Sequence, residues 1–136
     1  MNVLASLLVA LVALAHAGFL VLEMFLWTTP FGLKTFGMTE EFAKASAVLA
    51  ANQGLYNGFL SAGLVWGLLA RKNGFAIKVF FLACVVVAGS FGAATAKLSI
   101  LYVQALPAAL ALLLVLLAHR TTRPPPPLSP ETEQAT

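Results

Sequence analysis

The chain alternates between long apolar stretches and short polar segments. A helix needs about 20 mainly apolar residues to cross a hydrocarbon core of roughly 30 Å, and four windows of the sequence are long enough. They cover residues 3–27, 45–70, 75–96 and 98–118. The connections between them are short, so successive helices are expected to be antiparallel neighbours. The pattern therefore predicts an all-α, polytopic membrane protein in which residues 1–118 form an antiparallel four-helix transmembrane bundle.

The remaining segments connect these windows or follow the last of them. The connections are residues 28–44, residues 71–74 and Lys97. Residues 119–136 are polar and contain a run of prolines at 124–127. Because such a segment cannot bury apolar area, it is expected to form a disordered Pro-rich cytoplasmic tail.

The N-terminus admits a second interpretation. Residues 7–14, followed by Ala15-His16-Ala17, resemble the apolar region and cleavage site of a signal peptide. Against this alternative, no Lys or Arg precedes the apolar run, and the hydrophobic stretch continues to Trp27. We therefore expect the first window to remain part of the protein.

Composition supports a membrane protein. Hydrophobic residues make up 60% of the chain and charged residues 10%, whereas soluble domains have about 45–50% apolar and about 25% charged residues. The net charge is +3, but the basic residues are scattered at window ends and form no stripe that could bind nucleic acid. The expected partner is the lipid bilayer.

Basic residues near the ends of the windows predict the orientation in the membrane. One side has Arg71, Lys72, Lys78, Arg120 and Arg123, and the other has Lys34, Lys44 and Lys97. The excess on the first side places both termini in the cytoplasm and the connection 28–44 on the outer face. This predicts a multi-pass protein of the bacterial inner (plasma) membrane.

Function is expected to lie with the few polar side chains inside the windows, because an ionisable group there costs at least about 2.5–3.5 kcal/mol. At about 100° per residue, His16, Glu23 and Trp27 share one face of the first window. His16 and Tyr56 both lie roughly 16 Å from the outer ends of their windows at about 1.5 Å per residue. The matched depths predict an outward-facing polar pocket with His16 and Tyr56 at its floor.

The expected ligand-binding set comes from the first, second and fourth windows. It consists of Glu23, Asn52, Gln53, Tyr56, Asn57, Trp27, Tyr102 and Gln104. In the alternative interpretation the amides only hydrogen-bond between helices, and Glu23 reaches back to the water interface. Small residues spaced four apart, such as Gly54 and Gly58, favour close helix packing within the chain or in a homodimer, and the sequence leaves both open. Pro107 is expected to kink the fourth window.

Several chemistries lack their usual residues. The sequence contains no Walker loop, GxGxxG, CxxC or HExxH motif. Cys84 lies in apolar surroundings and is interpreted as a packing residue. His16 and His119 are at opposite levels, which argues against axial ligation of a haem within one chain. We therefore expect no metal and no cofactor.

One run of sequence resembles a known family. The segments Glu23-Met24-Phe25-Leu26-Trp27 and Asn52-Gln53-Gly54-Leu55-Tyr56-Asn57-Gly58-Phe59-Leu60, with Pro30 and Phe36-Gly37 between them, are similar to domain of unknown function 1304, a family of small integral membrane proteins. The likeness covers about residues 1–118. It implies a four-helix membrane protein and a site that includes Glu23, Asn52, Gln53, Tyr56 and Asn57, but no reaction.

Three functional hypotheses follow. The first is a small inner-membrane protein that binds or transports a small molecule or ion in the outward-facing pocket, with Glu23 as charged anchor and His16 as proton carrier. The second is a membrane-embedded acid-base enzyme of the isomerase type, acting on a lipophilic substrate through His16 and Glu23. The third is a structural or accessory membrane subunit. Whether the chain is an enzyme stays open at this point.

Overall fold

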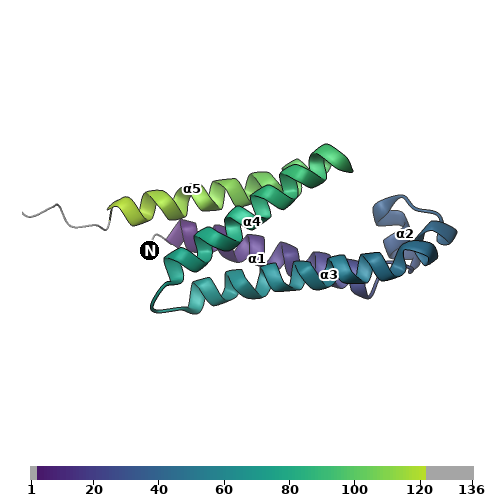
Figure 1. The fold of residues 1–136 in the computed structure, drawn as a ribbon, viewed down its shortest axis with the longest axis horizontal. Coiled ribbons are helices and arrows are strands. Elements are labelled where there is room, and N and C mark those ends of the chain that lie inside the picture. The colour runs from purple at the N-terminus through teal and green to yellow at the C-terminus, as the bar shows by residue number, and fades with distance from the viewer. Residues whose placement is uncertain (1–2, 122–136) are drawn as a thin grey trace, which may run out of the picture.

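The fold is given by a computed structural model that describes residues 3–121. These residues form five α-helices and one π-helix, without a β-strand in that range (Figure 1). The helices are α1 (Val3–Met24), α2 (Pro30–Phe36), α3 (Glu40–Leu69), α4 (Gly74–Thr95), the π-helix η1 (Leu101–Ala105) and α5 (Leu106–Thr121). The prediction of an all-helical chain is confirmed. Of the predicted tail, residues 119–121 continue α5, and residues 122–136 lie outside the described range.

The long helices pack in pairs around a small apolar core. α1 contacts α3 and α5, and α4 contacts the same two helices. Val9, Leu64, Leu82 and Val85 are fully buried at the centre. Many other large apolar side chains point outward, among them Phe91, which is 70% exposed. A helix that is hydrophobic on all sides is typical of a protein whose solvent is lipid.

Three helices in the described range are long and apolar enough to cross a membrane. They are Val3–Met24, Gly74–Thr95 and the combined helix Leu101–Thr121. α3 is the longest helix, with 30 residues, but its amide side chains Asn52, Gln53 and Asn57 lower its hydropathy. The same residues that mark α3 as a functional candidate therefore weaken its signal as a membrane span.

The first connection is more ordered than the sequence windows suggest. Residues 28–44 were expected to be a plain connection, yet they contain α2 and the first turn of α3. Thr29 caps α2, because its side-chain oxygen accepts a hydrogen bond from Gly32 N at 3.2 Å. Pro30 follows at the first helical position, which suits its fixed φ. Gly37 ends the helix at φ 67°, a left-handed conformation that favours glycine.

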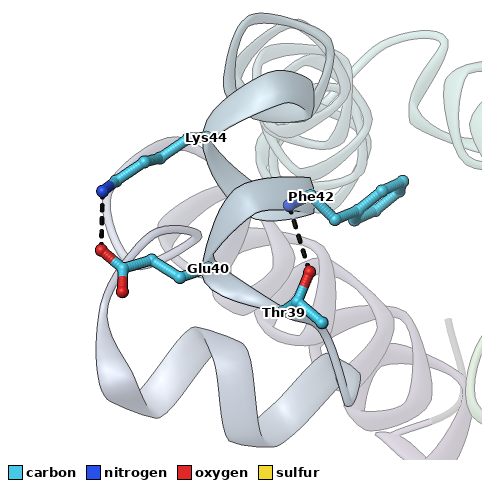
Figure 2. Close-up of polar contacts among 4 residues, drawn as sticks. All are labelled: Thr39, Glu40, Phe42 and Lys44. Carbon is cyan, nitrogen blue, oxygen red and sulfur yellow. Dashed lines mark hydrogen bonds and ion pairs between the residues drawn. The ribbon is translucent and has the colours of Figure 1, made fainter.

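The start of α3 is fixed by a second threonine cap. Thr39 Oγ1 accepts a hydrogen bond from Phe42 N at 3.2 Å, and the Lys44 ammonium lies 2.6 Å from a Glu40 carboxylate oxygen (Figure 2). Glu40 and Glu41 occupy the first turn, where acidic side chains favour the helix dipole. α3 therefore begins five residues before the apolar window at 45–70.

The last helix is interrupted just before its proline. Pro107 has no N–H, and its ring crowds the carbonyl of residue 103 in a regular α-helix. The chain forms the wider turn η1 over residues 101–105 instead, and Leu106 N donates to Leu101 O. η1 packs against α4 at Gly89, where a Cβ atom would lie 2.8 Å from Ala105 N. The expected irregularity at Pro107 is thus a π-turn.

Candidate functional site

Two glycines of α3 bring α3 close to the last turns of α1. A Cβ atom at Gly54 would lie 2.6 Å from Met24 Cγ and 3.1 Å from Leu20 O, and one at Gly58 would overlap the Leu20 side chain. Because neither glycine has a Cβ atom, the two backbones approach closely. The polar groups of the two helices are thereby placed within hydrogen-bonding distance.

The shortest polar contact between these helices joins Glu23 and Asn57. Asn57 Nδ2 donates to Glu23 Oε2 at 2.7 Å. Asn57 is only 5% exposed, and Glu23 is half-buried. Within the described residues no Lys, Arg or His forms an ion pair with Glu23. The carboxylate is thus held by one neutral donor, which leaves it able to bind a cation or a hydrogen-bond donor.

His16 lies on α1, as Glu23 does, but the two side chains have different partners. His16 is 1% exposed. Its Nδ1 lies 2.8 Å from Val12 O, and its Nε2 lies 3.4 Å from Gln104 Nε2 in η1. Because a carbonyl only accepts and an amide nitrogen only donates, these partners fit a neutral imidazole with its proton on Nδ1. Gln104 of η1 is therefore the polar neighbour of His16 on the last helix.

One further pair of contacts connects α1 with α3. Ser61 Oγ donates to Ala13 O at 2.8 Å, close in sequence to His16. Trp27 Nε1 donates to Ser46 Oγ at 3.1 Å, beyond the end of α1. Neither serine was among the predicted site residues. A signal was present, because each lies on α3 at the depth of its partner, but short hydroxyl side chains are too common to single out.

The remaining predicted site residues are exposed. Among the described residues, Asn52 bonds only to Val48 O of its own helix, at 3.0 Å, and Gln53 is exposed beside it. Tyr56 is 55% exposed and Tyr102 is 61% exposed. The structure brings Glu23 to Asn57 and His16 to Gln104, but it does not bring Tyr56 to His16.

The position of Tyr56 follows from the faces of α3. At 100° per residue, Asn52 and Tyr56 each lie about 20° from Gly63 around the axis of α3, so the three residues form one stripe along the helix. Gly63 faces the ring of Phe81 on α4. Towards the end of the molecule that carries α2, the α4–α5 hairpin diverges from the α1–α3 pair (Figure 1). The same stripe is therefore covered by α4 at Gly63 and left uncovered at Asn52 and Tyr56.

Within the described residues, no group of three or more His, Cys, Asp or Glu side chains could hold a metal ion. His16 and Glu23 have separate partners, and neither lines the hollow at Lys78 and His119 or the one at Phe80 and Phe91. The arrangement of this site is therefore two interhelical pairs, one charged and one neutral.

Comparison with known proteins gives a family but no activity. A family described as Protein of unknown function (DUF1304) matches residues 10–116. The chain is also 30% identical over 115 residues to the uncharacterized protein YpaA of Lactococcus lactis subsp. lactis, a match that covers 83% of this chain and 97% of that protein. No solved structure matches the chain.

Proposed function

The chain belongs to the DUF1304 family, and we propose that it is a four-span protein of the bacterial inner membrane that binds a small cation or hydrogen-bond donor at Glu23. The observation that carries the proposal is the half-buried Glu23 carboxylate, whose partner within the described residues is the neutral amide of Asn57. An ionisable side chain inside a membrane-spanning helix is costly and usually marks a functional site. A ligand with a positive charge would offset that cost.

The packing of α3 supports the four-span proposal. α3 lies against both α1 and α4, which have the length and composition of spans. Its 30 residues extend over about 45 Å at 1.5 Å per residue, enough to cross a bilayer. The basic residues favour cytoplasmic termini, so the α2 end and Glu23 would face outward.

Asn52 and Tyr56 lie outside the proposed site. They are exposed on the face of α3 that they share with Gly63, whereas Gly54 on the opposite face approaches Glu23. His16 and Gln104 lie deeper and are buried or half-buried, so their proposed role is to continue the polar path inward.

The test is a thermal unfolding titration of the purified protein in detergent. The probes are methylammonium, tetramethylammonium and sodium chloride at matched ionic strength. A ligand at a hundred times its Kd stabilises the folded state by about 2.7 kcal/mol, so a specific cation should raise the Tm. Glu23→Gln should abolish that shift, because the amide keeps the shape of the carboxylate but not its charge.

Glu41→Gln is the matched control, because it makes the same chemical change at an exposed carboxylate of the first turn of α3. It should leave the shift unchanged. Equal effects of the two variants, or no shift with any probe, would contradict the proposal and favour the accessory-subunit interpretation. Flux of the stabilising cation into vesicles containing the protein would then distinguish transport from binding alone.

A further inference from the structure

A hollow of about 330 Å³ lies at the opposite end of the molecule, where α3 ends, α4 begins and α5 ends. Three of its lining residues are basic, namely Arg71, Lys78 and His119, and no Asp or Glu of residues 3–121 lines it. Leu68, Phe75 and Val115 supply apolar walls. The hollow therefore combines positive charge with apolar surface.

Lys78 is the buried member of the basic set. It is 5% exposed, and its Nζ donates to Gly67 O at 2.9 Å. An ammonium has three donors, and no other hydrogen bond or ion pair of Lys78 occurs within the described residues. Burial of a charge with one neutral partner is costly. Two of its N–H groups remain for an anion.

Gly74 keeps the space beside this ammonium open. A Cβ atom there would lie 2.9 Å from Gly67 O and 3.4 Å from Lys78 Nζ. Gly74 is also the first residue of α4, and the preceding Asn73 makes no side-chain cap hydrogen bond. The first N–H groups of α4 are thus uncapped by that side chain, and a helix N-terminus favours negative charge.

The other basic groups border the same space. The His119 ring stacks on Phe75, with 3.8 Å between ring centroids and 15° between planes. Arg71 follows the end of α3 and is exposed, so its guanidinium can reach a ligand from the solvent side. Arginine matches the paired oxygens of a phosphate group.

We propose that this hollow binds a phosphate group, carried by an anionic lipid or by a soluble phosphate compound. The basic residues predict that this end faces the cytoplasm, where basic pockets between membrane helices bind lipid headgroups. The apolar walls give a place for the glycerol and first acyl carbons of a lipid. The proposal stands apart from the site at Glu23, which lies at the other end of the chain's helices.

The experiment compares three additions to the detergent-purified full chain: phosphatidylglycerol, phosphatidylcholine and inorganic phosphate, the last against chloride at equal ionic strength. Binding is measured from the concentration dependence of the Tm. Phosphatidylglycerol should raise the Tm more than phosphatidylcholine does. A rise with inorganic phosphate as well would show that the phosphate alone is recognised, and a rise with phosphatidylglycerol only would identify a lipid site.

Arg71→Gln should lower the affinity for phosphate about tenfold, which corresponds to the loss of one charge-assisted hydrogen bond. Lys72→Gln is its matched control, because it removes the same charge at the adjacent exposed residue, which does not line the hollow. Lys78→Met should also weaken binding, and circular dichroism checks that the variant is folded. The proposal would be overturned by equal weakening in Arg71→Gln and Lys72→Gln. It would also be overturned if phosphatidylglycerol raised the Tm no more than phosphatidylcholine and phosphate raised it no more than chloride.

Discussion

The two helix pairs of the molecule use small residues in different ways. In the α1–α3 pair, Gly54 and Gly58 bring the backbones together, and Glu23 and Asn57 then meet across the contact. In the α4–α5 hairpin, close approach at Gly89 brings α4 onto Ala105 and is accompanied by apolar packing. Close packing alone therefore does not indicate a site. A close helix contact indicates a candidate site where polar side chains flank the small residues.

The hairpin should be the more sensitive pair to added volume. In Gly89→Ala the new Cβ would lie 2.8 Å from the backbone atom Ala105 N, which cannot rotate away as a side chain does. We expect a loss of about 1–3 kcal/mol in the free energy of unfolding, measured by thermal or denaturant unfolding in detergent.

Gly18→Ala is the control for that measurement. No neighbouring atom of the part of the chain that the structure describes lies within 4 Å of a Cβ atom at Gly18, and alanine has the higher helix propensity. We expect unchanged or slightly increased stability. A loss at Gly18 as large as that at Gly89 would show that the close approach of α4 and η1 is not the cause.

The polar contact of the α1–α3 pair should give the next largest effect. Asn57→Ala leaves the half-buried Glu23 carboxylate without its donor, which should cost about 1–2 kcal/mol. Asn52→Ala removes the same amide at an exposed position, where it donates to Val48 O of its own helix, and should cost less than about 0.5 kcal/mol. Both are measured as changes in Tm, and similar losses would contradict the assigned role of Asn57.

The hydrogen bond that joins the α1–α3 pair to the last helix, between His16 and Gln104, should contribute less to stability. His16 and Gln104 are joined at 3.4 Å, at the long end of hydrogen-bond distances. A double-mutant cycle with His16→Leu and Gln104→Leu should give a coupling energy near 0.6 kcal/mol, the average for polar contacts between membrane helices. A coupling above about 2 kcal/mol would indicate a much stronger connection between the pairs.

The smallest effect is expected at the exposed ion pair of α3. Lys44 lowers the pKa of the Glu40 carboxyl through its hydrogen bond and its charge. Because the folded pKa lies below the unfolded one, the stabilisation is present above the usual carboxyl pKa and is lost as the pH falls through the folded pKa. Comparing Glu40→Gln with the parent across this acidic range should show a slight difference at neutral pH that vanishes in acid.

The sequence identified the polar side chains of α1 and α3, but not the direction in which they point around the helices. The rise per residue placed His16 and Tyr56 at one level, but α3 turns Gly54, Asn57 and Ser61 towards α1 and leaves Tyr56 exposed. Which face of α3 meets α1 depends on the packing of glycines against specific partners, and hydropathy does not contain this information.

Local signals were available for the part of the fold that the windows missed. Thr29-Pro30 and Gly37 are start and stop signals of a short helix, and they bound α2. A search for apolar windows passes over them, because α2 is too short to span a bilayer. The bond from Lys78 to Gly67 O could not be predicted in the same way, since it depends on the conformation of the intervening turn.

The π-turn at η1 sets the angular register of the whole last helix. A π-turn accommodates one residue more than an α-turn, and one residue corresponds to about 100° of rotation. Removal of a single residue between 101 and 105 would therefore rotate the preceding segment by more than a quarter turn relative to α5, and Gln104 would no longer point to His16. A relative shorter by one residue at this point would present a different side chain to the imidazole. The chain length between 101 and 105 therefore determines which side chain contacts His16.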